Sequence, residues 1–168
     1  MQIGIPTEVM QDEHRVAATP ETVKKLIALK HTVIVQAGAG EGSSIPDAEY
    51  TAAGATIVPK ASDIYSKADL VLKVRGPAQD ELSHLKSGSA VVGLLAPSNK
   101  AQLESYAKKG IVGFSLELLP RITRAQVMDV LSSQANIAGY KAVMVAEELF
   151  WAYTRFVVSW NQSESYWT

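Results

Sequence analysis

The sequence predicts an α/β domain built on a doubly wound, mainly parallel sheet, with a long connecting helix toward its C-terminal end. Two observations support this fold class: short, wholly apolar runs alternate with helical patterns, and a single long helical pattern follows them. Continuous apolar runs are typical of strands that are covered on both faces. Alternation of such strands with helices predicts parallel pairing through crossover connections.

Six runs rich in valine, isoleucine and leucine are the expected strands. They cover residues Gln2–Ile5, Thr32–Gln36, Thr56–Val58, Leu70–Val74, Ala90–Leu95 and Ile111–Ser115. Capping patterns mark two of the helices between them. Thr19 precedes Pro20, and proline fits the first helical position. Asn99 and Gln102 form a pair similar to a capping box.

The stretch from Thr123 to Phe150 has helical spacing throughout. A helix of this length extends about 40 Å, which is long for a domain of this size, so we expect it to connect two domains. The composition then changes, because Trp151, Trp160 and Trp167 are the three tryptophans of the chain. We therefore expect residues 1–148 to form one subdomain and residues 149–168 to form an atypical aromatic tail. The alternative is a terminal helix that packs through aromatic anchors.

Composition and charge exclude several function classes. The chain has 168 residues, 47% of them hydrophobic and 20% charged, with a net charge of −1, and therefore no basic surface for nucleic acid. It contains no cysteine, and its three histidines are far apart, so we expect no metal site. The apolar runs are shorter than the roughly 20 residues that span a bilayer, and we expect a cytoplasmic location.

A glycine-rich segment follows the second expected strand, Ala37-Gly38-Ala39-Gly40-Glu41-Gly42. Its spacing differs from the dinucleotide fingerprint, because the third glycine of that motif would fall on Ser43. Nor does it lead directly into a helix, whose N-terminus would bind a pyrophosphate. We expect a simple glycine turn here.

Three cations lie near the carboxyl ends of expected strands: Arg15 follows the first strand, and Lys73 and Arg75 end the fourth. Ligands of doubly wound sheets bind at this edge. A cluster of this kind can face a carboxylate or a phosphate. The alternative is a solvated rim in which the cations pair with Glu8, Asp12 or Glu13.

Polar side chains recur every three residues at the start of the long helical stretch. Gln126, Asp129 and Ser132 would share one helical face, and Arg121 lies just before them. An amide, a carboxylate and a hydroxyl in a row suit a carboxamide and a ribose. An ordinary solvated helix face has the same spacing, and the spacing alone leaves both interpretations open.

Two long segments resemble a known family. Residues 4–26, GIPTEVMQDEHRVAATPETVKKL, are similar to the N-terminal signature shared by alanine dehydrogenases and the NAD(H)-binding component of proton-translocating nicotinamide nucleotide transhydrogenase. Asp12 departs from it, since the signature usually has asparagine there. Residues 120–142, PRITRAQVMDVLSSQANIAGYKA, resemble the transhydrogenase form of a second diagnostic segment. The similarity extends to about Glu148.

The resemblance implies one of two Rossmann-like subdomains, with NAD(H) in the cleft between them and NADP(H) on a partner. It places Arg121, Gln126, Asp129 and Ser132 at the nicotinamide end of the cofactor, with Gln126 orienting the ring for hydride transfer. It implies a homodimer in the full-length form, peripheral to the inner membrane through a membrane-bound beta subunit. The second subdomain, which carries the family's glycine fingerprint, is not in this sequence, and we expect the chain alone to be inactive.

The same resemblance separates two enzymes. In alanine dehydrogenases, the positions that match Arg15 and Lys73 hold the substrate carboxylate, and a histidine precedes an Ala-Pro pair. Here the matching stretch, residues 93–97, reads GLLAP and has no histidine. Because deamination needs a proton-transfer group, the sequence favours the transhydrogenase. An alanine dehydrogenase-like fragment and a non-catalytic association module are the alternatives.

Overall fold

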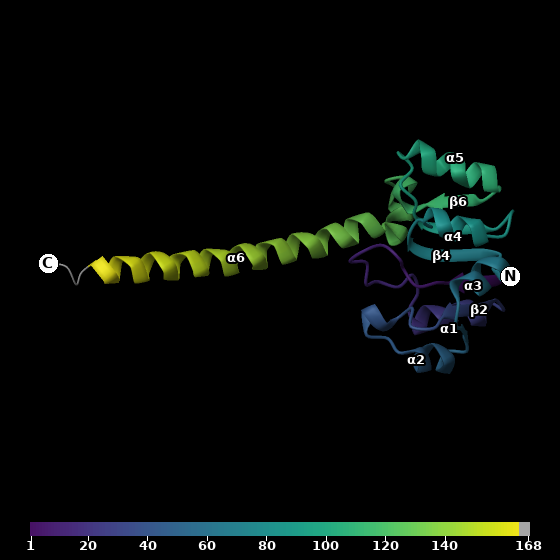
Figure 1. Cartoon of the computed structure of the whole chain (residues 1–168), viewed down its shortest axis with the longest axis horizontal. Coiled ribbons are helices and arrows are strands. Elements are labelled where there is room, and N and C mark those ends of the chain that lie inside the picture. The colour runs from purple at the N-terminus through teal and green to yellow at the C-terminus, as the bar shows by residue number, and fades with distance from the viewer. Residues whose placement is uncertain (165–168) are drawn as a thin grey trace. The chain divides into compact units, whose positions relative to one another are not determined.

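The computed structural model describes residues 1–164, with side chains described through Trp151. The chain divides into two units, Met1–Arg121 and Ile122–Thr168. The first unit holds the sheet with its helices, and the second is helical (Figure 1).

One six-stranded parallel sheet organises the first unit, in the order β3-β2-β1-β4-β5-β6. In chain order the strands are β1 (Gln2–Ile5), β2 (Thr32–Gln36), β3 (Thr56–Val58), β4 (Leu70–Arg75), β5 (Ala90–Leu94) and β6 (Val112–Ser115). The predicted fold class is therefore confirmed, and the ends of the last three strands differ by one residue from those predicted. The strand order reverses between β1 and β4, which is where ligands bind in sheets of this kind.

Helices cover the sheet on two sides. They are α1 (Pro20–Ala28), α2 (Asp47–Ala52), α3 (Ala61–Lys67), α4 (Gln79–His84) and α5 (Lys100–Lys109), with short 3₁₀ helices η1 (Glu41–Ser43) and η2 (Leu116–Leu118). Side chains alternate along β2, so Val33 packs with the α1–α2 core and Ile34 with the α3–α5 core. Burial on both sides explains why the strands are apolar without interruption.

Both predicted caps form. Thr19 accepts a hydrogen bond from the Thr22 N–H at the start of α1, at 3.4 Å. Asn99 accepts one from the Gln102 N–H at the start of α5, at 3.3 Å. The Gln102 side chain donates to the Tyr106 hydroxyl at 2.6 Å, so the reciprocal half of a capping box is replaced by this contact.

The second unit corrects the prediction of one long helix from Thr123. A 3₁₀ helix, η3 (Thr123–Met128), ends at Asp129, whose ψ of 87° is not helical, and α6 (Val130–Glu164) begins after it. The interruption arises because the Asp129 carboxylate accepts from the Ser132 N–H at 3.0 Å, which is an N-terminal cap.

The helix α6 extends beyond Phe150, to Glu164. Trp160 lies in the part of α6 whose side chains are not described, and Trp167 lies outside the described residues. The proposal of a separate aromatic tail stays a prediction. In the part of the chain that the structure describes, none of the helices combines the length and apolar character needed to cross a membrane.

Candidate functional site

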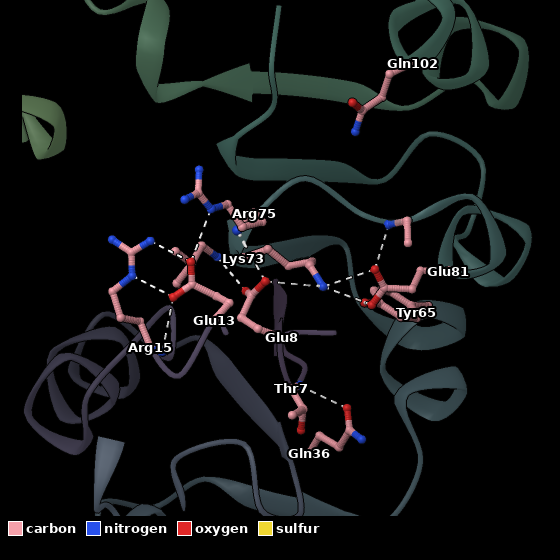
Figure 2. A network of polar contacts seen from close by, with 12 residues as sticks. Thr7, Glu8, Glu13, Arg15, Gln36, Tyr65, Lys73, Arg75, Glu81 and Gln102 are labelled. Atoms are coloured by element: carbon pink, nitrogen blue, oxygen red, sulfur yellow. Dashed lines mark hydrogen bonds and ion pairs between the residues drawn. The ribbon is translucent and has the colours of Figure 1, made fainter. Parts of the chain in front are cut away.

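Lys73 lies at the centre of a polar network at the carboxyl end of β4 (Figure 2). Its side chain is 1% exposed, and its Nζ lies 2.9 Å and 3.1 Å from the two carboxylate oxygens of Glu81. A second carboxylate, Glu8, lies 3.7 Å from the same nitrogen. The expectation of a solvated rim is wrong for Lys73, because alternate β4 side chains face the α3–α5 core and Lys73 follows Val71 on that face.

Glu81 connects three elements. Besides binding Lys73, it accepts a hydrogen bond from the Ala78 N–H at 2.7 Å and thereby caps α4. It also accepts from the hydroxyl of Tyr65 on α3, which is buried. Burial raises the pKa of Tyr65, and the hydrogen bond to Glu81 raises it further. Tyr65 is therefore a fixed donor at any physiological pH.

Glu8 ties the loop after β1 to the end of β4. It accepts from the Val74 N–H at 2.6 Å and from the Arg75 N–H at 3.3 Å. Burial raises the pKa of Glu8, although the charge of Lys73 and the two backbone N–H groups act in the opposite direction. The backbone donors at this strand end are therefore occupied by a carboxylate of the chain itself.

Glu13 pairs with the two arginines at this edge. The distances are 2.6 Å to Arg15 Nη2 and 3.2 Å to Arg75 Nε. The side-chain hydrogen bond from Arg15 is the main cause that lowers the pKa of Glu13 to about 2. The predicted alternative, cations paired with Glu8 and Glu13, is therefore confirmed for these arginines (Figure 2).

The end of β5 is held by Glu117, which lies in η2. Its carboxylate accepts from the Leu95 N–H at 2.9 Å, the Ala96 N–H at 3.0 Å and the hydroxyl of Ser115. Ala96 has a φ of 49°, in the left-handed region. Sequence reasoning missed both Glu81 and Glu117. For Glu81 a signal existed, since a glutamate at the third helical position can bond back to the cap residue.

The glycine segment forms the expected turn. Gly38 has a φ of +75°, and η1 follows Gly40. A Cβ on Gly42 would lie 2.7 Å from the backbone oxygen of His14. The hydroxyl of Ser43 donates to that same oxygen at 2.9 Å. This glycine therefore permits close contact between two parts of the chain, so the turn is not shaped to receive a phosphate.

The predicted cofactor residues fall on both units. Arg121 is the last residue of the first unit and is exposed. In the second unit, Gln126 is an exposed residue of η3, and Asp129 separates η3 from α6. The Ser132 hydroxyl donates to Asp129 Oδ2 at 2.6 Å. The predicted continuous helical stripe is wrong, although Asp129 and Ser132 do lie together.

The chain belongs to a family of dehydrogenase and transhydrogenase domains. Residues 4–138 match the family described as "Alanine dehydrogenase/PNT, N-terminal domain". Within that family the chain is homologous to the N-terminal part of the transhydrogenase alpha subunit. It is 47% identical over 150 residues to the first of the polypeptides that make up the NAD(P) transhydrogenase alpha subunit of Rhodospirillum rubrum, covering 86% of this chain and 39% of that protein.

A solved structure and an enzyme relative agree with this placement. The crystal structure of a transhydrogenase from Sinorhizobium meliloti has a TM-score of 0.83 and 48% identity, covering 87% of this chain and 44% of that one. An alanine dehydrogenase of Mycolicibacterium smegmatis is 36% identical over 146 residues, covering 86% of this chain and 39% of that enzyme. The two transhydrogenases are thus more similar to the chain than this alanine dehydrogenase is.

Proposed function

We propose that the chain is the first subdomain of the NAD(H)-binding component of a proton-translocating transhydrogenase, which transfers hydride between NAD(H) and NADP(H). The observation that carries the proposal is the end of β5. Residues 93–97 there have no side chain that exchanges a proton. Oxidative deamination needs such a group. Hydride transfer between two nicotinamides needs positioning instead.

Glu117, the carboxylate that contacts this loop, is unsuited to proton transfer. Although burial acts against its ionisation, hydrogen bonds from Ser115 and from the N–H groups of Leu95 and Ala96 lower its pKa. A general acid or base works best with a pKa near the operating pH. Glu117 instead stays ionised, and its oxygens are occupied by donors of the chain itself.

The residues proposed to hold the nicotinamide end of NAD(H) are Arg121, Gln126, Asp129 and Ser132. Bound NAD(H) would supply or accept the hydride. Gln126 has an amide that can pair with a carboxamide and thereby orient the ring. Asp129 and Ser132 are already fixed to each other through two hydrogen bonds, which suits them to present a defined polar surface to a ribose. Preorganisation of this kind lowers the cost of binding.

The chain fits only part of a dinucleotide. The turn at Gly40 and Gly42 is filled by backbone atoms, and within residues 1–164 no glycine-rich loop opens directly into an α-helix. We therefore assign the pyrophosphate to a second subdomain. The chain spans only 39% of the length of its Rhodospirillum rubrum relative, which leaves room for such a subdomain in a complete protein.

The proposed partners follow from the same assignment. An NADP(H)-binding component must present its nicotinamide to that of NAD(H), and a membrane-bound beta subunit must couple the reaction to proton movement. We place the complete protein on the cytoplasmic side, peripheral to the inner membrane through that complex, and as a homodimer.

An NADH fluorescence titration tests the proposal on two proteins. The first is the 168-residue chain. The second is a chimera in which residues 1–148 replace the matching part of the Rhodospirillum rubrum subunit. We expect the chain to bind NADH weakly or not at all, because helix N-terminal pyrophosphate binding is a main source of dinucleotide affinity. We expect the chimera to bind NADH and, with its partner subunits, to reduce an NADP analogue.

Two results would contradict the proposal. Micromolar NADH affinity of the chain alone would show that it does not need a second subdomain. Alanine-dependent NADH formation by the chimera, without transhydrogenation, would show that the alanine dehydrogenase alternative is correct.

A further inference from the structure

Glu117 holds the segment that leaves the sheet. The strand β6 makes its last pairing at Ser115, which lies opposite Gly93, and η2 follows at once. From η2 the Glu117 carboxylate reaches back to β5 and accepts from the N–H groups of Leu95 and Ala96, at 2.9 Å and 3.0 Å. The hydroxyl of Ser115 donates to the same carboxylate and orients it.

The far side of this contact is constrained as well. Ala96 has a φ of 49°, which side chains other than glycine rarely adopt because Cβ approaches the following carbonyl. Its N–H is bound by Glu117, and its carbonyl accepts from the Asn99 N–H at 2.9 Å, directly before α5. A disfavoured conformation persists only where its surroundings hold it. Glu117 is one of the groups that hold it.

Arg121 lies four residues after Glu117, at the end of the first unit. Four residues of extended chain span at most about 14 Å. The Glu117 anchor therefore limits the volume in which the Arg121 backbone can lie. Pro120 shortens that volume further, since its ring fixes one backbone angle immediately before Arg121.

We propose that Glu117 is a positioning residue for Arg121: its bonds to the end of β5 fix the start of the segment that carries the nicotinamide contacts. The inference rests on the proposed function, because only that function gives Arg121 a cofactor to bind. Glu117 itself does not contact the cofactor. A lowered pKa supports the role, since the carboxylate keeps its charge throughout the neutral range.

The first experiment uses the 168-residue chain and needs no cofactor. Glu117→Gln preserves the size of the side chain but replaces one acceptor oxygen with a donor group. We expect amide hydrogen exchange at Leu95 and Ala96 to become at least about 10-fold faster, and the Arg121 backbone amide to show a lower heteronuclear NOE. Glu104→Gln, at an exposed site on α5, is the control and should leave all three amides unchanged. Unchanged amides in Glu117→Gln would overturn the proposal.

The second experiment uses the chimera and separates positioning from folding. We expect Glu117→Gln to raise KM for NADH about 10-fold while kcat stays within about twofold, because a shift of about 1 Å in a binding group costs 10- to 100-fold. Glu117→Asp, which keeps the charge but shortens the reach, should lie between the two. A lower melting temperature with an unchanged KM would mean a structural role only, and would overturn the proposal.

The two experiments fail independently. If the wild-type chimera shows no transhydrogenation, the proposed function is wrong, whatever the amide exchange shows. If the wild-type chimera is active but Glu117→Gln leaves both the amides and KM unchanged, only the positioning role is wrong. If Glu117→Gln does not fold, Glu117→Asp supplies both measurements, and an unchanged KM there with unchanged amides would likewise overturn the role.

Discussion

Lys73 of β4 and Glu81 of α4 form an ion pair 2.9 Å long in which both side chains are almost completely buried, at 1% and 6% exposure. The pair lies at the end of the sheet where the strand order reverses, which is where doubly wound sheets bind ligands. In this chain the ammonium is instead bound by carboxylates of the chain itself. The site is therefore closed by internal charges.

Loss of Lys73 should destabilise the fold strongly. Lys73→Met leaves the carboxylates of Glu8 and Glu81 buried without their cation, and breaking a buried pair in this way costs about 3–5 kcal/mol. Urea unfolding of the chain measures this loss. Lys73→Met combined with Glu81→Gln should recover part of it.

The matched control is Lys86→Met. Lys86 pairs with Asp69 at 3.2 Å, but both side chains are about half exposed, at 52% and 46%. Surface pairs of this kind contribute less than about 1 kcal/mol. Equal losses from Lys73→Met and Lys86→Met would contradict the buried-pair interpretation.

Acid should weaken the fold through Glu13. Its pKa falls from 4.5 to about 2 in the folded chain, chiefly through the Arg15 hydrogen bond. A carboxylate with a lowered folded pKa stabilises the protein above its unfolded pKa, and that stability is lost as the pH falls through the folded pKa. We expect the unfolding midpoint to drop between pH 4.5 and about 2, and Glu13→Gln to flatten the profile over that range. An unchanged profile in Glu13→Gln, compared with exposed Glu104→Gln, would count against this assignment.

Alanine at Gly42 should disturb the contact with the loop after β1. The added Cβ would lie 2.7 Å from the His14 backbone oxygen, and backbone atoms can move apart only by shifting the loop. Overpacking of this kind costs about 1–3 kcal/mol, measurable by thermal unfolding. Gly139→Ala is the control, because its Cβ would meet nothing within 4 Å. A neutral Gly42→Ala would show that the loop yields freely.

Asparagine at Gln126 should affect catalysis more than binding. In the chimera, Gln126→Asn draws the amide back by about 1 Å, and a displacement of that size can lower a rate on the order of 100-fold. Stopped-flow hydride transfer and an NADH titration measure rate and affinity separately. Rate and affinity falling in equal proportion would identify Gln126 as a binding residue only.

Deletion of residues 151–168 should leave the chemical-denaturation midpoint unchanged. Trp151 is 58% exposed, and the last part of the chain differs in composition from the rest. The midpoint should be followed by circular dichroism, because the deletion removes all three tryptophans. A loss of several kcal/mol would show that these residues are an integrated part of the fold.

Much of the fold followed from the sequence alone, for local reasons. A strand buried on both faces must be apolar along its whole length, so the runs at β1, β2 and β4 could be recognised without tertiary information. The Thr19 and Asn99 caps depend on atoms within three residues of each other. The family resemblance also rested on two continuous segments, and the comparison with known proteins confirmed it.

The helix break at Asp129 was missed because two local signals compete there. Apolar spacing continues through the position and favours a helix, whereas the aspartate side chain bonds the Ser132 N–H and starts a new one. Side chains that can bond the nearby backbone offer it an alternative to the helical ladder. Spacing alone gives no measure of which signal is stronger.

Only the tertiary structure decided the chemistry at the sheet edge. From the sequence, Lys73 had three candidate acidic partners, and Glu81 was not among them. The pairing depends on β4 lying beside β1 and on α4 folding back over the α3–α5 core, which brings Glu8 and Glu81 to one ammonium. Glu117 reaches Leu95 across 22 residues for the same reason, since β6 lies beside β5. Ion pairs and backbone caps between elements depend on which strands are neighbours, and strand order is a property of the whole sheet.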